Sequence, residues 1–192
     1  SSDSVGASGA SRAPGVVRGA LALAILLALV GLPGKAMAAD AFCVDTAGNL
    51  IGTASSAGHD VACGQDAEAS GGNAIAIGYQ AKATTGTNPM AIGTKALAST
   101  DSAVAVGDDA RATGLTSTAI GYSTRAEGKY SVALGSGAQA LGDLGYALGN
   151  NAQARENDVA VGAGALTGST GSKQTTAIGY NAGLGSKDTQ NS

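Results

Sequence analysis

Few side chains of this 192-residue chain have the types and spacing that enzymatic or metal chemistry needs. The single histidine, His59, precedes Asp60, and a serine, histidine and aspartate triad would depend on it alone. Asp108 and Asp109 form a carboxylate pair that a cation could bind weakly, although a solvated turn explains the pair more simply. The chain has neither the Cys/His spacing of a zinc site nor a phosphate-binding Gly-x-x-x-x-Gly-Lys-Ser/Thr loop. We therefore predict no catalytic residue, no metal and no cofactor, and we expect His59 to be a surface residue.

Three of the five tyrosines occupy the same local position, since Tyr79, Tyr122 and Tyr180 each directly follow Ala-Ile-Gly. Amphipathic aromatic side chains are common at protein interfaces. These tyrosines could contact a ligand or fill the crevice between neighbouring subunits, and we favour the second interpretation.

These side chains are positioned by a sequence repeat that runs from Val61 to Leu184 and is plainest in Ser102 to Ala112. Each copy is anchored on a glycine, and successive anchors are 14, 15, 14, 14, 14, 14, 13 and 17 residues apart. Self-similarity at a short fixed period decides the fold before any other signal does. The anchors are Gly64, Gly78, Gly93, Gly107, Gly121, Gly135, Gly149, Gly162 and Gly179.

The residues on either side of each anchor form regular columns. Two positions before it the residue is always alanine: Ala62, Ala76, Ala91, Ala105, Ala119, Ala133, Ala147, Ala160 and Ala177. One position before it, Cys63 stands in the first copy and branched residues stand in the others: Ile77, Ile92, Val106, Ile120, Leu134, Leu148, Val161 and Ile178. After the anchor, an Ala-x-Ala segment with mostly polar middle residues indicates a strand with one solvated face. The consecutive apolar residues before the anchor indicate a strand buried on both faces.

A period of about 14 residues is too short for a crossover helix, which needs 10–12 residues besides its strands. It has room for two strands of about five residues and two corners. We therefore predict an all-β fold, a parallel β-roll or β-solenoid of about nine 14-residue coils. In such a stack, each column of the repeat becomes a ladder of like residues.

The orientation of the ladders has two solutions, because the branched column and the alanine column have opposite parity. We favour alanine as the roll interior, so that the branched ladder faces outward as a core between chains. An uncovered apolar stripe of this size is rare on soluble monomers, and the same stripe on identical chains is the simplest cover. The converse, with the branched residues inside and alanine outside, stays open.

The pattern Ala-[Ile/Val/Leu]-Gly-x-x-Ala-x-Ala at this step resembles the YadA-like head repeat of trimeric autotransporter adhesins over Val61 to Leu184. The resemblance implies a left-handed roll assembled as a homotrimer. It also implies a non-enzymatic bacterial cell-surface adhesin with a role in virulence. Such a head attaches to host extracellular matrix or cells, or mediates autoaggregation. The ligand-binding residues stay unassigned.

Members of that family continue into a neck, a coiled-coil stalk and an outer-membrane barrel. This chain runs from Ser1 to Ser192 without them and is expected to be an N-terminal fragment. We expect it to meet the outer membrane only through the missing C-terminal anchor.

Residues 1–38 are predicted to be a disordered leader followed by a signal peptide. Arg18 precedes an apolar run of 14 residues, Gly19 to Leu32, and Ala36-Met37-Ala38 has the small residues of a cleavage site. Cleavage is expected after Ala38, with export to the cell surface. A membrane helix or a buried helix is the alternative, but a span needs about 20 residues.

The remaining chain divides into an N-terminal cap over residues 39–60, the repeats over 61–184 and a frayed tail over 185–192. The cap contains a predicted turn at Gly48-Asn49. An even pair of cysteines in an exported protein suggests a disulfide between Cys43 and Cys63, tying the cap to the first coil. Cys63 could instead be a small buried hydrophobe.

The formal net charge is −3, with 11 basic and 14 acidic residues. Residues 1–38 contain three of the basic residues and one of the acidic ones, so removing them leaves 8 and 13, a charge of −5. An acidic chain without basic clusters argues against nucleic acid as a partner.

Two other functions compete with an adhesin head. One is a left-handed β-helix acyltransferase, but that fold repeats three hexapeptides per coil and uses a histidine base. The 14-residue step and the position of His59 speak against it. The other is a purely structural spacer solenoid or an ice-binding one, and the mixed outward column disfavours the Thr ladders of ice binders.

Overall fold

The computed structural model describes residues 41–43, 53–54, 59–169 and 174–185. The predicted signal peptide, its cleavage site at Ala38, the Gly48-Asn49 turn and the tail after residue 185 lie outside the described residues. The described residues contain 18 strands and no helix, and all belong to one compact unit, residues 37–192. The predicted all-β class is confirmed.

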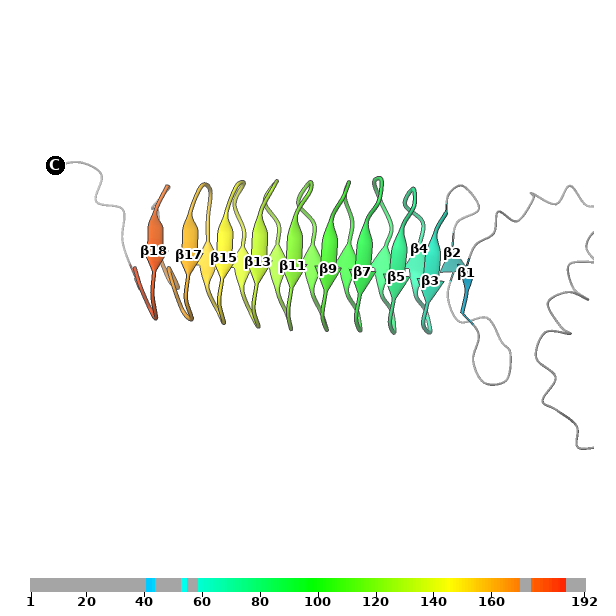
Figure 1. Ribbon diagram of the computed structural model, residues 1–192, viewed down its shortest axis with the longest axis horizontal. Coiled ribbons are helices and arrows are strands. Elements are labelled where there is room, and N and C mark those ends of the chain that lie inside the picture. The colour runs from blue at the N-terminus through cyan, green and yellow to red at the C-terminus, as the bar shows by residue number, and fades with distance from the viewer. Residues whose placement is uncertain (1–40, 44–52, 55–58, 170–173, 186–192) are drawn as a thin grey trace, which may run out of the picture. The chain divides into compact units, whose positions relative to one another are not determined.

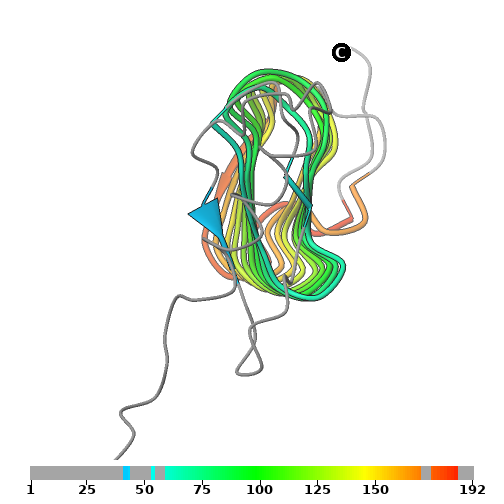
Figure 2. The same ribbon diagram turned by 90° about the vertical axis from the view of Figure 1, so that its right-hand side faces the viewer.

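The strands alternate along the chain between two parallel sheets (Figure 1). The ten-stranded sheet contains β1 (Ala41–Phe42), β3 (Val61–Cys63), β5 (Ile75–Ile77), β7 (Met90–Ile92), β9 (Val104–Val106), β11 (Thr118–Ile120), β13 (Val132–Leu134), β15 (Tyr146–Leu148), β17 (Val159–Val161) and β18 (Thr176–Ile178). The eight-stranded sheet contains β2 (Thr53–Ala54), β4 (Glu68–Ala69), β6 (Lys82–Ala83), β8 (Leu97–Ala98), β10 (Arg111–Ala112), β12 (Arg125–Ala126), β14 (Gln139–Ala140) and β16 (Gln153–Ala154). Seen along the stack, successive coils overlie one another with the two sheets on opposite sides (Figure 2). The predicted parallel β-solenoid is therefore confirmed.

Like residues stack on like residues throughout both sheets. Ala105 of β9, for example, pairs with Ala91 of β7 on one side and Ala119 of β11 on the other. A shift of one residue would turn every apolar side chain of a strand to the opposite face. The repeat thus sets the register as well as the fold.

The anchor glycines cannot be replaced without strain. Gly135 has a φ of +124°, and a Cβ placed there would lie 2.7 Å from the carbonyl carbon and oxygen of Gly149 in the next coil. Both the backbone conformation and the spacing of the coils exclude a side chain here. The glycine column is thus a requirement of stacking at this corner.

The strands are shorter than the five residues expected, with three residues in the ten-stranded sheet from β3 onward and two in the eight-stranded sheet. In most coils, both corners contain a non-glycine residue in the left-handed region, such as Asp109 at φ +52° and Tyr130 at φ +57°. Such residues turn the chain and end the ladder pairing. The corners therefore take up most of the 14 residues.

The last two copies lack the second strand that the repeat predicts, because residues 163–168 and 181–185 form turns. In the eighth copy Thr167 replaces the second alanine of Ala-x-Ala. Leu166 adopts φ +54° and turns inward, where only 2% of its surface is exposed. An inward leucine needs room that a flat Ala-x-Ala strand does not leave, so the strand gives way to a turn.

The described part of the predicted cap extends the solenoid. β1 pairs in parallel with β3, and β2 pairs in parallel with β4. These two strands thus add to the two sheets in the same order as those of a regular coil.

Candidate functional site

The interior of the roll is made of alanine from both sheets. The predicted interior column is buried at every copy, with Ala62 and Ala177 at its two ends 4% and 7% exposed and the others at 0%. The alanines of the Ala-x-Ala segments, such as Ala110 and Ala112, face them and are also fully buried. Small side chains from both sides bring the sheets close together, and they leave no room for a branched ladder inside.

The branched ladder lies on the outer surface of the ten-stranded sheet. We call this surface the apolar face and define it by the outward residues of β3 to β18, which stand one and three positions before each anchor. Four of its branched side chains, Ile77, Ile120, Leu134 and Ile178, expose more than a third of their surface, and the other four are half-buried. In the second outward column, three positions before each anchor, most residues from Val61 to Val159 are valine, isoleucine or methionine. The single chain therefore presents a continuous apolar surface along its length.

The outer surface of the eight-stranded sheet, here called the polar face, has the opposite character. In the order of the strands β4 to β16, its outward residues are Glu68, Lys82, Leu97, Arg111, Arg125, Gln139 and Gln153. Leu97 is the one apolar member of this row, and it pairs in register with Lys82 on one side and Arg111 on the other.

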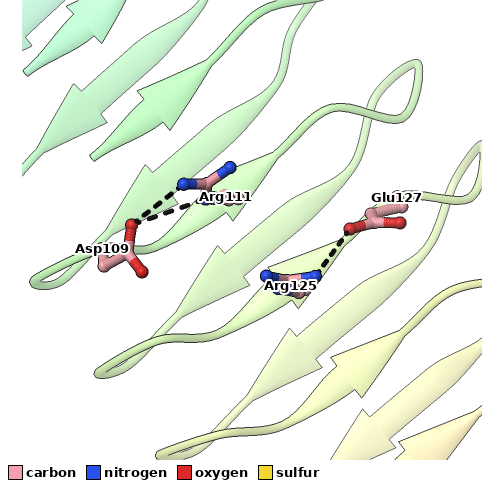
Figure 3. A network of polar contacts seen from close by, with 4 residues as sticks. All are labelled: Asp109, Arg111, Arg125 and Glu127. Atoms are coloured by element: carbon pink, nitrogen blue, oxygen red, sulfur yellow. Dashed lines mark hydrogen bonds and ion pairs between the residues drawn. The ribbon is translucent and has the colours of Figure 1, made fainter. Parts of the chain in front are cut away.

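Neighbouring like charges on the polar face turn to different carboxylates. Arg111 and Arg125 stand directly beside each other in register. Arg111 contacts Asp109 in the corner before its strand at 3.4 Å, whereas Arg125 contacts Glu127 after its strand at 3.6 Å (Figure 3). All four side chains are partly exposed, so each pair contributes at most about 1 kcal/mol to stability. The two pairs therefore contribute little to the stability of the fold.

A shallow groove of about 480 Å³ lies on the polar face over Leu97. Lys82 and Arg111 border it from the two neighbouring strands, Glu68 from β4 one strand further along, and Lys95 from the corner before β8. Sequence reasoning missed this groove. The interruption of a charged outward column by a single leucine was the signal that could have found it.

Cys43 and Cys63 form a disulfide, with their Cα atoms 5.0 Å apart and a sequence separation of 20. Cys63 is half-buried at the first position of the branched ladder. The bond therefore joins the residue after β1 to β3 at the N-terminal end of the apolar face.

The structure does not bring the other chemistry-bearing residues into a common site. His59 and Asp108 are exposed, and the Asp109 carboxylate contacts Arg111. Among the described residues, no group of three or more His, Cys, Asp or Glu side chains could hold a metal ion.

The three tyrosines that follow anchors, Tyr79, Tyr122 and Tyr180, expose 43%, 62% and 81% of their surface. They stand in non-adjacent coils, so they form no continuous aromatic ladder. Packing of these side chains between subunits stays a prediction.

The sequence matches a known family over part of its repeats. Residues 55–81, 69–88, 85–110 and 112–138 match the YadA head domain repeat. These coils are YadA head repeats. Such repeats form the head of trimeric autotransporter adhesins, a non-enzymatic class of cell-surface proteins. None of the curated proteins compared with the chain matches it.

Two buried carboxylates of the YadA-type head were missed by sequence reasoning. Asp60 and Asp158 stand four positions before their anchors and are 0% and 1% exposed. Asp60 Oδ1 accepts a hydrogen bond from the backbone N–H of Ala74 at 2.7 Å, and Asp158 Oδ1 accepts one from Thr175 at 2.8 Å. Because both carboxylates accept hydrogen bonds from the backbone of the next coil, we assign both residues to the fold.

No described residue of the YadA-type head belongs to a helix that is long and apolar enough to cross a membrane.

Proposed function

We propose that this YadA-type head is the attachment module of a bacterial surface adhesin, in which three identical chains pack through their apolar faces. The assembled head attaches to host extracellular matrix or host cells, or to heads on neighbouring bacteria, and it acts by binding rather than by catalysis. The protein is exported through the signal peptide in residues 1–38 and is anchored in the outer membrane.

The observation that carries the proposal is the apolar face of a chain made of YadA head repeats. With alanine filling the interior, the branched ladder cannot contribute to a core within one chain. Complete burial of a Val, Ile or Leu side chain stabilises a protein by about 1.5–3 kcal/mol. The side chains of this face are only partly buried in the monomer, so burial of their remaining surface can stabilise an assembly. Identical copies present the same stripe, so closed symmetric association covers all of them at once.

Charge supports a surface function of the assembled head. Association through the apolar face leaves the opposite, polar face of each chain in solvent. That face mixes acidic, basic and amide side chains. A mixed polar surface suits recognition of extracellular molecules better than recognition of nucleic acid, which needs an excess of basic residues.

The proposal is tested in two steps with the purified chain. Light scattering over a dilution series should give the mass of three chains. The trimer should then bind immobilised matrix proteins, cultured cells or a second layer of immobilised head, whereas a variant that stays monomeric should bind much more weakly through loss of multivalency. A folded monomer at every concentration would overturn the assembly, and a stable trimer that attaches to none of these surfaces would overturn the adhesive function.

A further inference from the structure

We propose that the groove over Leu97 binds a hydroxyl-rich saccharide that carries one carboxylate, with the carboxylate lying against the Lys95 amine. This inference names a ligand class for the adhesin proposed above and rests on that function for its biological role.

The groove exists because a short apolar side chain stands between two long charged ones. Leu97 pairs in register with Lys82 and Arg111, and each of these charged side chains contacts a carboxylate that also borders the groove. Lys82 Nζ lies 3.6 Å from Glu68 in the preceding coil, and a terminal nitrogen of Arg111 lies 3.4 Å from Asp109 in the corner. The half-buried Leu97 is left as the floor. An apolar floor of this kind suits the C–H face of a sugar ring, and the volume of about 480 Å³ falls within the range of ligand sites.

The charge of the lining selects among ligands. Three acidic and three basic side chains border the groove, which leaves it with no net charge: Asp66, Glu68 and Asp109 against Lys82, Lys95 and Arg111. A polyanion such as nucleic acid or an acidic peptide would meet the carboxylates as well as the cations. Hydroxyl groups both donate and accept hydrogen bonds, so a polyol can use the carboxylates as acceptors and the basic and amide groups as donors.

Lys95 supplies the position for a single negative charge. It is exposed, and within the described residues its amine makes no ion pair, unlike Lys82 and Arg111. It stands two residues before Leu97, in the corner that leads into β8. A carboxylate placed on Lys95 would gain a charge-assisted hydrogen bond without breaking an existing pair.

The groove also stays accessible in the assembly proposed above. Its strand residues belong to the eight-stranded sheet, whereas the apolar face belongs to the ten-stranded sheet. The two sheets lie on opposite sides of the roll (Figure 2). Three chains that pack through their apolar faces would therefore present three grooves, which would strengthen binding to a surface that displays many copies of the sugar.

The test is a titration of the purified chain by calorimetry with 3′-sialyllactose, with lactose as the uncharged probe and a heparin tetrasaccharide as the polyanion. We expect saturable binding of sialyllactose, weaker binding of lactose and still weaker binding of heparin. Lys95→Met should weaken sialyllactose binding about tenfold and leave lactose unchanged, since only the charge-assisted contact is lost. Leu97→Gln should weaken both sugars, because it removes the apolar floor.

Arg125→Ala, on the same face but outside the groove, is the matched control and should bind as the parent does. Thermal melting of each variant confirms that it is folded. Absence of saturable sugar binding by the parent, binding that neither groove variant alters, or heparin as the tightest ligand would each overturn the inference. If a trimer attaches to cells and the groove variants attach equally well, the saccharide site fails and the adhesin stands. If the groove binds the sugar but the trimer attaches to no surface, the adhesive function fails and the site stands.

Discussion

Replacement of Ile120 by aspartate puts a charge at the centre of the apolar face. Ile120 lies at the end of β11 and pairs in register with Val106 and Leu134, so its side chain is surrounded by the branched ladder. It is 42% exposed in the single chain. The substitution therefore disturbs the interior of one chain little and an interface between chains strongly.

The expected loss follows from that exposed fraction. Full burial of an isoleucine side chain contributes about 1.5–3 kcal/mol, so covering the remaining 42% contributes about 0.6–1.3 kcal/mol per chain and about 2–4 kcal/mol per trimer. This term alone lowers the association constant by about 30- to 700-fold. Desolvation of three aspartates adds to it, since a buried and unpaired carboxylate costs several kcal/mol.

The assay is the mass in solution of parent and variant over the same dilution series, followed by light scattering, with circular dichroism to show that the coils are retained. We expect the parent to stay trimeric at concentrations where Ile120→Asp is a folded monomer. A variant with unchanged mass and unchanged melting would refute the reasoning, because the branched ladder would then lie in no interface. A variant that unfolds outright would instead show that the ladder stabilises the single chain.

Three further predictions concern the fold. Gly135→Ala should lower the free energy of unfolding by several kcal/mol, because its Cβ would lie 2.7 Å from backbone atoms of the next coil. The control is Gly72→Ala, whose Cβ has only one neighbour at 4.0 Å and which should melt like the parent. Equal melting of the two variants would contradict the stacking argument. Reduction of the Cys43–Cys63 disulfide should lower the free energy of unfolding by about 3 kcal/mol for a loop of this length. Hydrogen exchange should locate the loss in the N-terminal coils, and uniform loss along the stack would argue against a local cap. Arg125→Ala should leave mass and fold intact, since it removes one half-exposed ion pair, and a drop in melting of more than about 5 °C would count against its outward placement.

The sequence predicts the fold of this protein wherever each residue stacks on an equivalent residue of the next coil. In an in-register parallel stack, each column of the repeat meets itself, so short-range periodicity also specifies the long-range pairing. The β-solenoid, its 14-residue step and the nine strands of the ten-stranded sheet from β3 onward follow from that rule. The rule fails where a copy departs from the repeat, as at Leu166, whose inward turn removes the second strand.

The sequence predicts only part of the groove over Leu97. The outward position of Leu97 follows from the alternation of Ala-x-Ala. Its environment does not, because it depends on which carboxylates Lys82 and Arg111 contact. Those contacts join residues of different coils or of a corner and a strand, and side-chain geometry selects them among several charged neighbours.

The sequence by itself determined the coil, the register and the opposite parity of the alanine and branched ladders, because these depend only on the period and on residue size. Only the tertiary structure decided which ladder lies inside. The two sheets approach closely enough that alanine fills the interior and the branched side chains remain outside. Spacing between sheets is a property of both strands of every coil together, so a single strand cannot reveal it.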